Sequence, residues 1–289
     1  MPPQKVKTRL LLPTGRMQKD LLELLSASGF GLKGNGRNYR PQCVDPELEV
    51  KFLKPLNIPR LVAMGRHELG FCGLDWVREH NAEVEVLLEL GLDPVRLVLA
   101  APEGDTMDSL RARKNLVLAT EYQNISQTFL KAQGIEATVL RTSGTTEVYP
   151  PEDADFIVDN TSTGSTLRDN KLDILATLMR SSTCLVADPE SLKRPEVREK
   201  ANHLVTLLKS TLDARSKVVL EMNVSNGSLV EILALLPAMK RPTVQTLAGG
   251  EAASVKTVVE RRDVRELVPK LLASGASDIL EFSLQKVVP

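Results

Sequence analysis

The sequence is constrained most by the regular alternation of short apolar runs and helical stripes between residues 8 and about 187. The first unit shows the order: Thr8 to Pro13 reads as a buried strand, the following Thr-Gly-Arg as a tight loop, and Met17 to Ser28 as a helix. Consecutive strands that are joined through helices lie parallel, in sheets whose faces the helices cover. The alternation therefore predicts an α/β fold with mostly parallel sheets.

The last part of the chain, residues 215–289, follows a different order. The elements predicted there are Lys217–Val224, Ser228–Leu236, Thr243–Leu247, Ser254–Glu260, Asp263–Ala273 and Ile279–Val287, read as strand, helix, strand, strand, helix and strand. Both helices carry apolar side chains at i, i+3, i+4 and i+7, a stripe suited to packing on a sheet. The βαββαβ order is that of the ferredoxin-like motif, so this segment is predicted to form a complete small domain.

Charge and cysteine content exclude several classes of function. The chain has 37 basic and 37 acidic residues, so net charge gives no reason to expect nucleic acid or a membrane surface as partner. Cys43, Cys72 and Cys184 are far apart and lack CxxC spacing, which disfavours a disulfide scaffold and a zinc site. No apolar segment approaches the roughly 18 residues of a membrane span, and the N-terminus does not read as a signal peptide. We expect a cytoplasmic protein.

The stretch DNTSTGSTLR, residues 159–168, places five hydroxyl side chains around a single glycine, directly after an apolar strand. Gly164 lets a ligand approach the backbone, and successive N–H and hydroxyl groups suit phosphate oxygens. Asp159 suits another task, accepting hydrogen bonds from sugar hydroxyls or holding Mg²⁺. An ordinary loop that caps a helix beginning near Leu167 is the alternative reading. The stretch matches neither the Walker A nor the GxGxxG pattern.

Together with other segments, this stretch resembles the phosphoribosyl-diphosphate loop of the ATP phosphoribosyltransferase family, the first enzymes of histidine biosynthesis. The resemblance extends over essentially the whole chain, in order and in spacing. The segments that carry it are LLLPTGRM, HELGFCGLD, RLVLAAPEG, NLVLATEYQN, RTSGTTEVYP, DADFIVD with the loop after it, LALLPAMKRPTVQTLAG and GASDILEFSLQKV. The last two segments are similar to the C-terminal regulatory domain of the family's long form.

The resemblance implies a reaction and a site. Members of the family join N1 of ATP to C1 of phosphoribosyl diphosphate and expel pyrophosphate, with Mg²⁺ on the phosphates. The catalytic residues carried over are Arg16, Glu147 and Asp159, and the first two also contact the nucleotide. The residues expected to bind phosphoribosyl diphosphate are Asp159, Thr161, Ser162, Thr163, Gly164, Ser165 and Thr166. The three histidines lack metal spacing, so no metal cage made by protein alone is expected.

The chain departs from the family's pattern in three places. Glu68 stands where aspartate is usual, Glu121 where a small residue is common, and the link at residues 150–153 is shorter than usual. All three lie in or beside segments that carry the resemblance. They raise the question of whether the nucleotide pocket keeps its shape.

The fold class expected is α/β, with a two-lobed catalytic region similar to periplasmic binding proteins and a C-terminal ferredoxin-like regulatory domain. Residues 1–97 with 180–214 would form one lobe and residues 98–179 the other. The substrates would lie in the cleft between the lobes, at the carboxyl ends of strands. Residues 215–289 would form the regulatory domain.

For the regulatory domain, the resemblance implies feedback inhibition by histidine and assembly into homo-oligomers, with dimers combining into a hexamer. The positions carried over for the inhibitor are Glu221, Thr243, Leu247 and Ala248. One alternative is a non-catalytic two-lobed protein that binds an anion or a nucleotide. Another is a catalytic subunit that needs an accessory protein, as the family's short form does. The complete C-terminal domain argues against the latter, because the short form lacks it.

Overall fold

The computed structural model describes residues 7–33, 38–237 and 241–288. Residues 1–6 of the predicted first lobe and residues 238–240 of the LALLPAMKRPTVQTLAG segment lie outside the described residues. The chain forms two compact units, residues 1–23 with 30–202 and residues 24–29 with 203–289. Within the described residues, no helix has the length and apolar character needed to cross a membrane.

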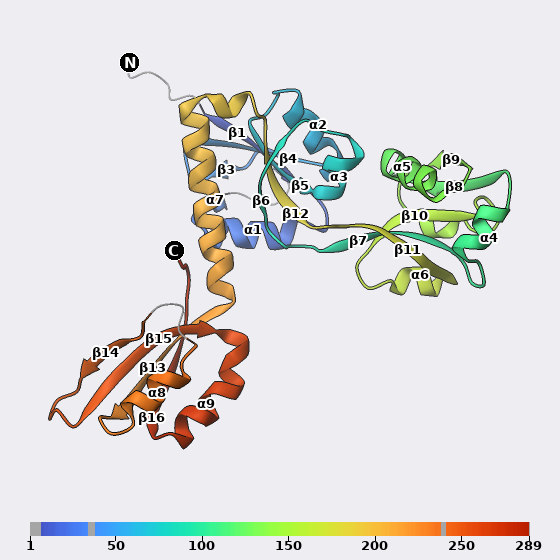
Figure 1. Cartoon of the computed structure of the whole chain (residues 1–289). Helices are drawn as coiled ribbons and strands as arrows, with labels where there is room; N and C mark the ends of the chain where they lie inside the picture. Colours follow the sequence, from blue (N-terminus) through green and yellow to red (C-terminus); the bar gives the residue numbers. More distant parts are fainter. Residues whose placement is uncertain (1–6, 34–37, 238–240, 289) are drawn as a thin grey trace, which may run out of the picture. The chain divides into compact units, whose positions relative to one another are not determined.

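The first unit contains a seven-stranded sheet in the order β2-β3-β4-β1-β5-β12-β6 (Figure 1). Its strands are β1 Thr8–Pro13, β2 Leu32–Lys33, β3 Gln42–Cys43, β4 Leu48–Leu53, β5 Leu69–Gly73, β6 Glu85–Glu89 and β12 Thr183–Ala187. The helices that follow its strands are α1 (Gln18–Ala27), α2 (Ile58–Ala63) and α3 (Leu74–Glu79). The central strand β1 is buried, since Leu10, Leu11 and Leu12 are at most 1% exposed.

The same unit contains a five-stranded sheet in the order β11-β7-β10-β8-β9. Its strands are β7 Val95–Pro102, β8 Leu116–Thr120, β9 Ala137–Arg141, β10 Phe156–Thr161 and β11 Leu172–Ser181. Its helices are α4 (Met107–Ala112), α5 (Gln123–Gln133) and α6 (Ser165–Asp169). Leu118, Phe156 and Val158 are fully buried in its core, together with Tyr122 between β8 and α5.

Both sheets are mixed, so the expectation of mostly parallel sheets was wrong. In the first sheet β1 pairs in parallel with β4 and β5, but β12 is antiparallel to β5 and to β6. In the second, β8 is parallel to β9 and β10, whereas β7 is antiparallel to β10 and β11. These four antiparallel pairs involve β7 and β12, which follow the passages of the chain between the two sheets without a crossover helix. Within the first sheet, β3 is also antiparallel to β2 and to β4.

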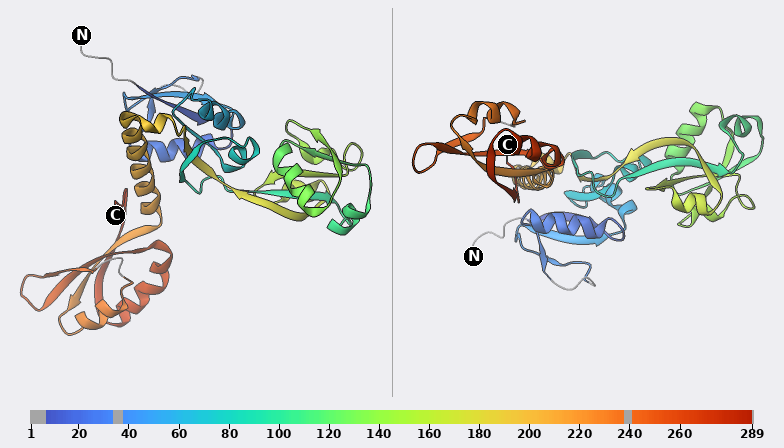
Figure 2. Two further views of the ribbon diagram at one scale, coloured as in Figure 1. Left: turned by 45° about the horizontal axis from the view of Figure 1, so that its top comes forward. Right: turned by 90° about the horizontal axis from the view of Figure 1, so that it is seen from below.

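Two paired strands connect the two sheets. β7 follows β6 of the first sheet after a short loop, and β11 leads into β12 through Ser182 alone. β7 and β11 pair antiparallel along their length, with register shifts between Ile174 and Ala176 and between Thr177 and Met179. Both views of Figure 2 show this ribbon of two strands running between the sheets.

The second unit contains the end of α7 (Pro195–Arg215) and a four-stranded antiparallel sheet in the order β14-β15-β13-β16. Its elements are β13 Lys217–Ser225, α8 Leu229–Leu235, β14 Thr243–Thr246, β15 Ala252–Glu260, α9 Val264–Ala273 and β16 Ala276–Ser283, which is the βαββαβ order read from the sequence. Alternate residues of β13, such as Leu220 and Met222, are buried against Ile232 of α8 and Leu271 of α9. The other face of the sheet is not covered by these helices.

Candidate active site

The hydroxyl loop, residues 159–166, turns sharply where β10 ends. Thr161 is the last residue of β10, and its Oγ1 accepts a hydrogen bond from the Gly164 N–H at 2.9 Å. Gly164 has φ of 77°, and a Cβ there would lie 3.4 Å from both Arg168 Nη1 and Ile174 Cδ1. A larger side chain at position 164 is therefore both strained and crowded.

Four of the loop's five hydroxyl groups are exposed. The exposed residues are Ser162, Thr163, Ser165 and Thr166. The hydroxyls of Thr163 and Ser165 are 2.9 Å apart, so they lie on one side of the turn. Thr161 is buried and holds the turn. The helix expected near Leu167 is present but ends at Asp169, because β11 begins at Leu172.

Three carboxylates gather where β10 runs into this loop. The pKa of Asp159 is raised to about 6, first by burial and then by the charges of Glu121 and Glu147. Glu147 lies in a short helical turn, Thr146–Val148, and Glu121 accepts a hydrogen bond from the Gly144 N–H. Within the described part of the chain, none of the three carboxylates forms a salt bridge. The structure thus brings the predicted pair Glu147 and Asp159 together, and adds Glu121, which the sequence marked only as a departure.

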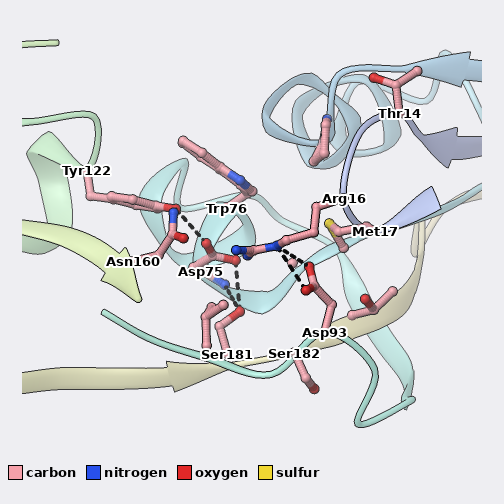
Figure 3. Close-up of a pocket in the computed structure, with 14 residues that line it drawn as sticks. Thr14, Arg16, Met17, Asp75, Trp76, Asp93, Tyr122, Asn160, Ser181 and Ser182 are labelled. Atoms are coloured by element: carbon pink, nitrogen blue, oxygen red, sulfur yellow. Dashed lines mark hydrogen bonds and ion pairs between the residues drawn. The ribbon is translucent and has the colours of Figure 1, made fainter. Parts of the chain in front are cut away.

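Arg16 lines a cavity of about 280 Å³ that it shares with Asn160 and Tyr122 (Figure 3). Its Nε lies 2.9 Å from Oδ1 and 3.1 Å from Oδ2 of Asp93. Arg16 follows β1 of the first sheet, and Asn160 belongs to β10 of the second. The two sheets therefore supply opposite walls of one cavity. The role of Asp93 in holding the guanidinium was not visible in the sequence.

A chain of hydrogen bonds connects four residues beside this cavity (Figure 3). Asp75 accepts from the Ser181 hydroxyl at 2.8 Å and from the Tyr122 hydroxyl at 2.8 Å. Asn160 Nδ2 donates to the Tyr122 hydroxyl oxygen at 2.9 Å. Sequence reasoning missed this chain: Asp75 entered it only as the last residue of the segment HELGFCGLD, and the residue lies in the first turn of α3.

A second cavity, of about 320 Å³, shares Trp76 with the first. The Trp76 ring stacks on Tyr122 and on His80, with ring centroids 4.6 Å and 5.9 Å apart. Burial lowers the pKa of His80, which disfavours the charged form of its ring. Arg60 and Arg141 supply positive charge to this cavity. Two guanidinium groups in one cavity suit a phosphate chain.

The comparisons with known proteins agree over the whole chain. The family model described as ATP phosphoribosyltransferase matches residues 54–210, and that of the family's C-terminal domain matches residues 214–286. The chain belongs to the ATP phosphoribosyltransferase family. It is 40% identical to the ATP phosphoribosyltransferase of Pelotomaculum thermopropionicum and 39% identical to that of Desulforudis audaxviator, over 98% of this chain and 100% of each relative.

Among solved structures, the chain is similar to the ATP phosphoribosyl transferase (HisG:HisZ) complex from Thermotoga maritima. The TM-score is 0.63 at 24% sequence identity, over 71% of this chain and 98% of that chain. This similarity shows a shared fold.

One departure from the ATP phosphoribosyltransferase pattern, Glu68, lies away from both cavities. Glu68 precedes β5, whereas Asp75 follows it, so the two residues are at opposite ends of this strand. Arg9 donates to Glu68 at 2.7 Å and 3.0 Å, and Arg194 donates at 2.8 Å. Burial alone would raise the pKa of Glu68, but the two arginines lower it to about 2. Glu121, another of the residues that depart from the pattern, lines the second cavity.

Of the four positions expected to bind the family's inhibitor, the structure brings two together. Glu221 of β13 and Thr243 of β14 both pair with Lys256 of β15, on the sheet face away from the helices. Glu221 Oε2 lies 3.0 Å from Lys256 Nζ. Leu247 and Ala248 follow β14, four positions further along, which is about 13 Å at the rise of a strand.

Proposed function

We propose that this chain transfers the 5-phosphoribosyl group from phosphoribosyl diphosphate to N1 of ATP and releases pyrophosphate, the first step of histidine biosynthesis. The observation that carries the proposal is the hydroxyl loop beside three carboxylates that no arginine or lysine of the described chain neutralises. Membership of the ATP phosphoribosyltransferase family supports it.

The reaction breaks the bond between C1 and the diphosphate oxygen and forms a bond between C1 and N1 of the purine. N1 attacks with its lone pair and carries no proton that a base must remove. Positive charge develops on the sugar carbon as pyrophosphate leaves, and the carboxylate of Asp159 stabilises it. The exposed hydroxyls of the hydroxyl loop bind the 5-phosphate. These groups act through orientation and electrostatic stabilisation.

The nucleotide is proposed to bind beside Arg16 and Glu147. The Arg16 guanidinium contacts the polyphosphate in a forked arrangement, and Asp93 keeps the guanidinium in place. Glu147 accepts a hydrogen bond from the ribose or the purine amino group. The second cavity, with Arg60 and Arg141, offers further positive charge to the phosphate chain.

Mg²⁺ fits this site as a companion of the substrates. The raised pKa of Asp159 marks an excess of negative charge that a cation relieves. Within the described residues, no group of three or more His, Cys, Asp or Glu is arranged to hold a metal ion by itself. Mg²⁺ is commonly bound by one or two carboxylates together with substrate phosphates. Asp159 and Glu147 would hold it, and it would neutralise the charge of the diphosphate.

The finer architecture is also a proposal. Residues 1–97 with 180–214 and residues 98–179 would be the two lobes of a catalytic region similar to periplasmic binding proteins. The order β14-β15-β13-β16 supports a ferredoxin-like assignment for residues 215–289. Homo-oligomers, as dimers or a hexamer, and a cytoplasmic location are proposed from family membership.

Histidine is proposed to inhibit the enzyme by binding to the third sheet. Glu221 accepts from its α-amino group, and Lys256 and Thr243 meet its carboxylate. Glu221→Ala should abolish histidine binding and inhibition but keep basal pyrophosphate release, and the matched control Glu251→Ala, an exposed acid of the same unit, should keep both. If millimolar histidine neither binds nor slows the wild type, this part of the proposal is wrong.

The decisive experiment is an assay of pyrophosphate release with ATP, phosphoribosyl diphosphate and Mg²⁺. The wild type should release pyrophosphate and build the near-ultraviolet absorbance of the N1 adduct. Gly164→Val should abolish binding of phosphoribosyl diphosphate, whereas Gly134→Val, at a comparable positive φ of 68° after α5, should keep it. If both substrates bind the wild type and no pyrophosphate appears, the non-catalytic alternative replaces the proposal.

A further inference from the structure

We propose that Asp75 is a positioning residue that acts through Tyr122 to orient the Asn160 side chain, so that the Asn160 carboxamide oxygen faces the cavity and accepts a hydrogen bond from the substrate. The inference rests on the proposed function. The substrate group is a hydrogen-bond donor of a nucleotide or sugar phosphate, either a ribose hydroxyl or the purine amino group.

The directions of the hydrogen bonds at Asp75 follow from counting hydrogens. Ser181 Oγ accepts from the Asp75 N–H at 3.0 Å and lies 2.8 Å from Asp75 Oδ1, so its single hydrogen points to that oxygen. The Tyr122 hydroxyl lies 2.8 Å from Asp75 Oδ2. An ionised carboxylate accepts and cannot donate. Both hydroxyl groups must therefore donate to Asp75.

The direction of the hydrogen bond between Asn160 and Tyr122 follows from that of the bond between Tyr122 and Asp75. Burial and the Asp75 charge raise the pKa of Tyr122 well above its usual range, so the phenol keeps its hydrogen. That hydrogen is committed to Asp75, and the phenol oxygen is then free only to accept. Asn160 must present its NH₂ group, which lies 2.9 Å away. Its carboxamide oxygen is left without a partner among the described residues and borders the cavity (Figure 3).

The phenol that relays this direction is held in place. Tyr122 is fully buried, and its ring stacks on Trp76 at 4.6 Å, so it does not leave the chain of hydrogen bonds by rotating. The acceptor oxygen of Asn160 therefore has a fixed direction at the cavity that Arg16 also lines. Fixed acceptors of this kind select ligands that carry a matching donor.

Asp75→Asn tests the proposal because it should exchange the donor and acceptor roles in the hydrogen bonds that connect position 75, Tyr122 and Asn160. The introduced amide donates to the Tyr122 oxygen, Tyr122 then donates to the Asn160 oxygen, and Asn160 turns its NH₂ group to the cavity. We expect KM for one substrate to rise about three- to tenfold, the value of one neutral hydrogen bond, with kcat changed by less than about twofold. The matched control is Asp188→Asn, which changes another buried carboxylate, one that accepts from the Ser191 hydroxyl at 2.6 Å and lines neither of the two cavities. It should lower the melting temperature and leave both KM values near those of the wild type.

Two further experiments distinguish the substrate concerned and separate positioning from a structural role. Varying ATP at saturating phosphoribosyl diphosphate, and the reverse, shows whether the donor belongs to the purine or to the transferred sugar. The double variant Asp75→Asn with Asn160→Asp should restore KM to within about threefold of the wild type, since Tyr122 then donates to one oxygen at position 160 and the other oxygen faces the cavity. A purely structural role for Asp75 does not predict this rescue.

Substrate binding can also be measured without turnover, because Trp76 is the single tryptophan of the chain and lines the cavity. Its fluorescence gives the Kd for ATP and for phosphoribosyl diphosphate separately. If the wild type releases no pyrophosphate, the proposed function fails, while these Kd values still test Asp75. Unchanged KM and Kd in Asp75→Asn overturn the inference. So does an equal loss in Asp75→Asn and Asp188→Asn, or a double variant no better than the single one.

Discussion

Glu68 and Asp159 are both largely buried carboxylates in the first compact unit, but their surroundings are opposite. Glu68, beside the first sheet, accepts hydrogen bonds from Arg9 and Arg194, and its pKa is lowered to about 2. Asp159, in the second sheet, has Glu121 and Glu147 as its charged neighbours, and its pKa is raised to about 6.

The difference separates a carboxylate that stabilises the fold from one that is available to a ligand. Two arginines already neutralise Glu68, so a ligand would gain nothing there. The charge of Asp159 is opposed by burial and by two like charges, and a bound cation or hydrogen-bond donor relieves it. Perturbed carboxylates of this second kind cluster at functional sites. Glu68 therefore has the surroundings of a structural carboxylate, whereas those of Asp159 support the proposed role in substrate binding.

The largest effect is expected from Glu68→Gln. The substitution leaves two guanidinium groups without their counter-charge, and breaking a buried ion pair costs about 3–5 kcal/mol of unfolding free energy. Urea denaturation measures this loss, and kcat/KM of the folded fraction should stay near the wild-type value. The matched control is Glu49→Gln, in the exposed pair with Arg40, which should cost less than about 1 kcal/mol. Equal losses in the two variants would remove the structural role given to Glu68.

Asp159→Asn should show the reverse behaviour. Removing the charge that stabilises the sugar carbon should lower kcat/KM about 100-fold, in the range seen when one group of a preorganised site is deleted. The unfolding free energy should not fall, because the lost charge was unfavourable in the folded state. Asp169→Asn, at an exposed acid ten positions further along the chain, is the control and should keep full activity. A large drop in stability in Asp159→Asn would contradict the assignment.

The two carboxylates should also give stability opposite dependences on pH. The folded-state pKa of Glu68, about 2, lies below the ordinary 4.5, so its contribution is complete above pH 4.5 and is lost as the pH falls towards 2. For Asp159 the folded-state pKa, about 6, lies above the ordinary 3.8, so stability is lost as the pH rises from 3.8 to 6.

The contribution of Asp159 is measured by the unfolding free energies of the wild type and of Asp159→Asn between about pH 4 and pH 7. The two proteins should be equally stable below pH 4, and the variant should be more stable by on the order of 2 kcal/mol at pH 7. A difference that stays constant with pH would mean that ionisation of Asp159 is not its source.

The smallest effect is expected from Glu121→Gln. Removing one of the two like charges should lower the pKa of Asp159 by less than about one unit, so the acid limb of kcat/KM should move to lower pH. The control is Glu103→Gln, at an exposed position after β7, which should leave the pH profile unchanged. An acid limb that does not move would show that Asp159 does not limit activity at low pH.

Features that depend on neighbouring residues were predictable from the sequence. The hydroxyl loop lies where β10 ends, Arg16 follows β1, and the six elements of the C-terminal domain occur in the order read from apolar spacing. Strand, turn and helix signals are local, so one sequence suffices to find them. The roles given to the residues of the hydroxyl loop stay predictions.

Features that depend on long-range pairing were not predictable. Leu172, Leu175 and Met179 have helical spacing, but this segment is β11, because pairing with β7 overrides the local preference. The bond from Tyr122 to Asp75 spans 47 positions, and the bond from Ser181 to Asp75 spans 106. No local pattern marks such partners. The same holds for Glu68, whose charge looks unpaired until Arg194 is brought beside it.

The register of β7 and β11 has a consequence for how such a chain could be assembled by recombination. Val95, where the chain begins the second sheet, is directly opposite Ser181, where the chain leaves it. Residues opposite each other in antiparallel strands have Cα atoms about 5 Å apart. Residues 95–181, which contain all strands of the second sheet, therefore begin and end at neighbouring positions beside the first sheet. Insertion, deletion or exchange of the coding segment between these two positions would add, remove or replace the whole second sheet and would keep the strand order of the first sheet.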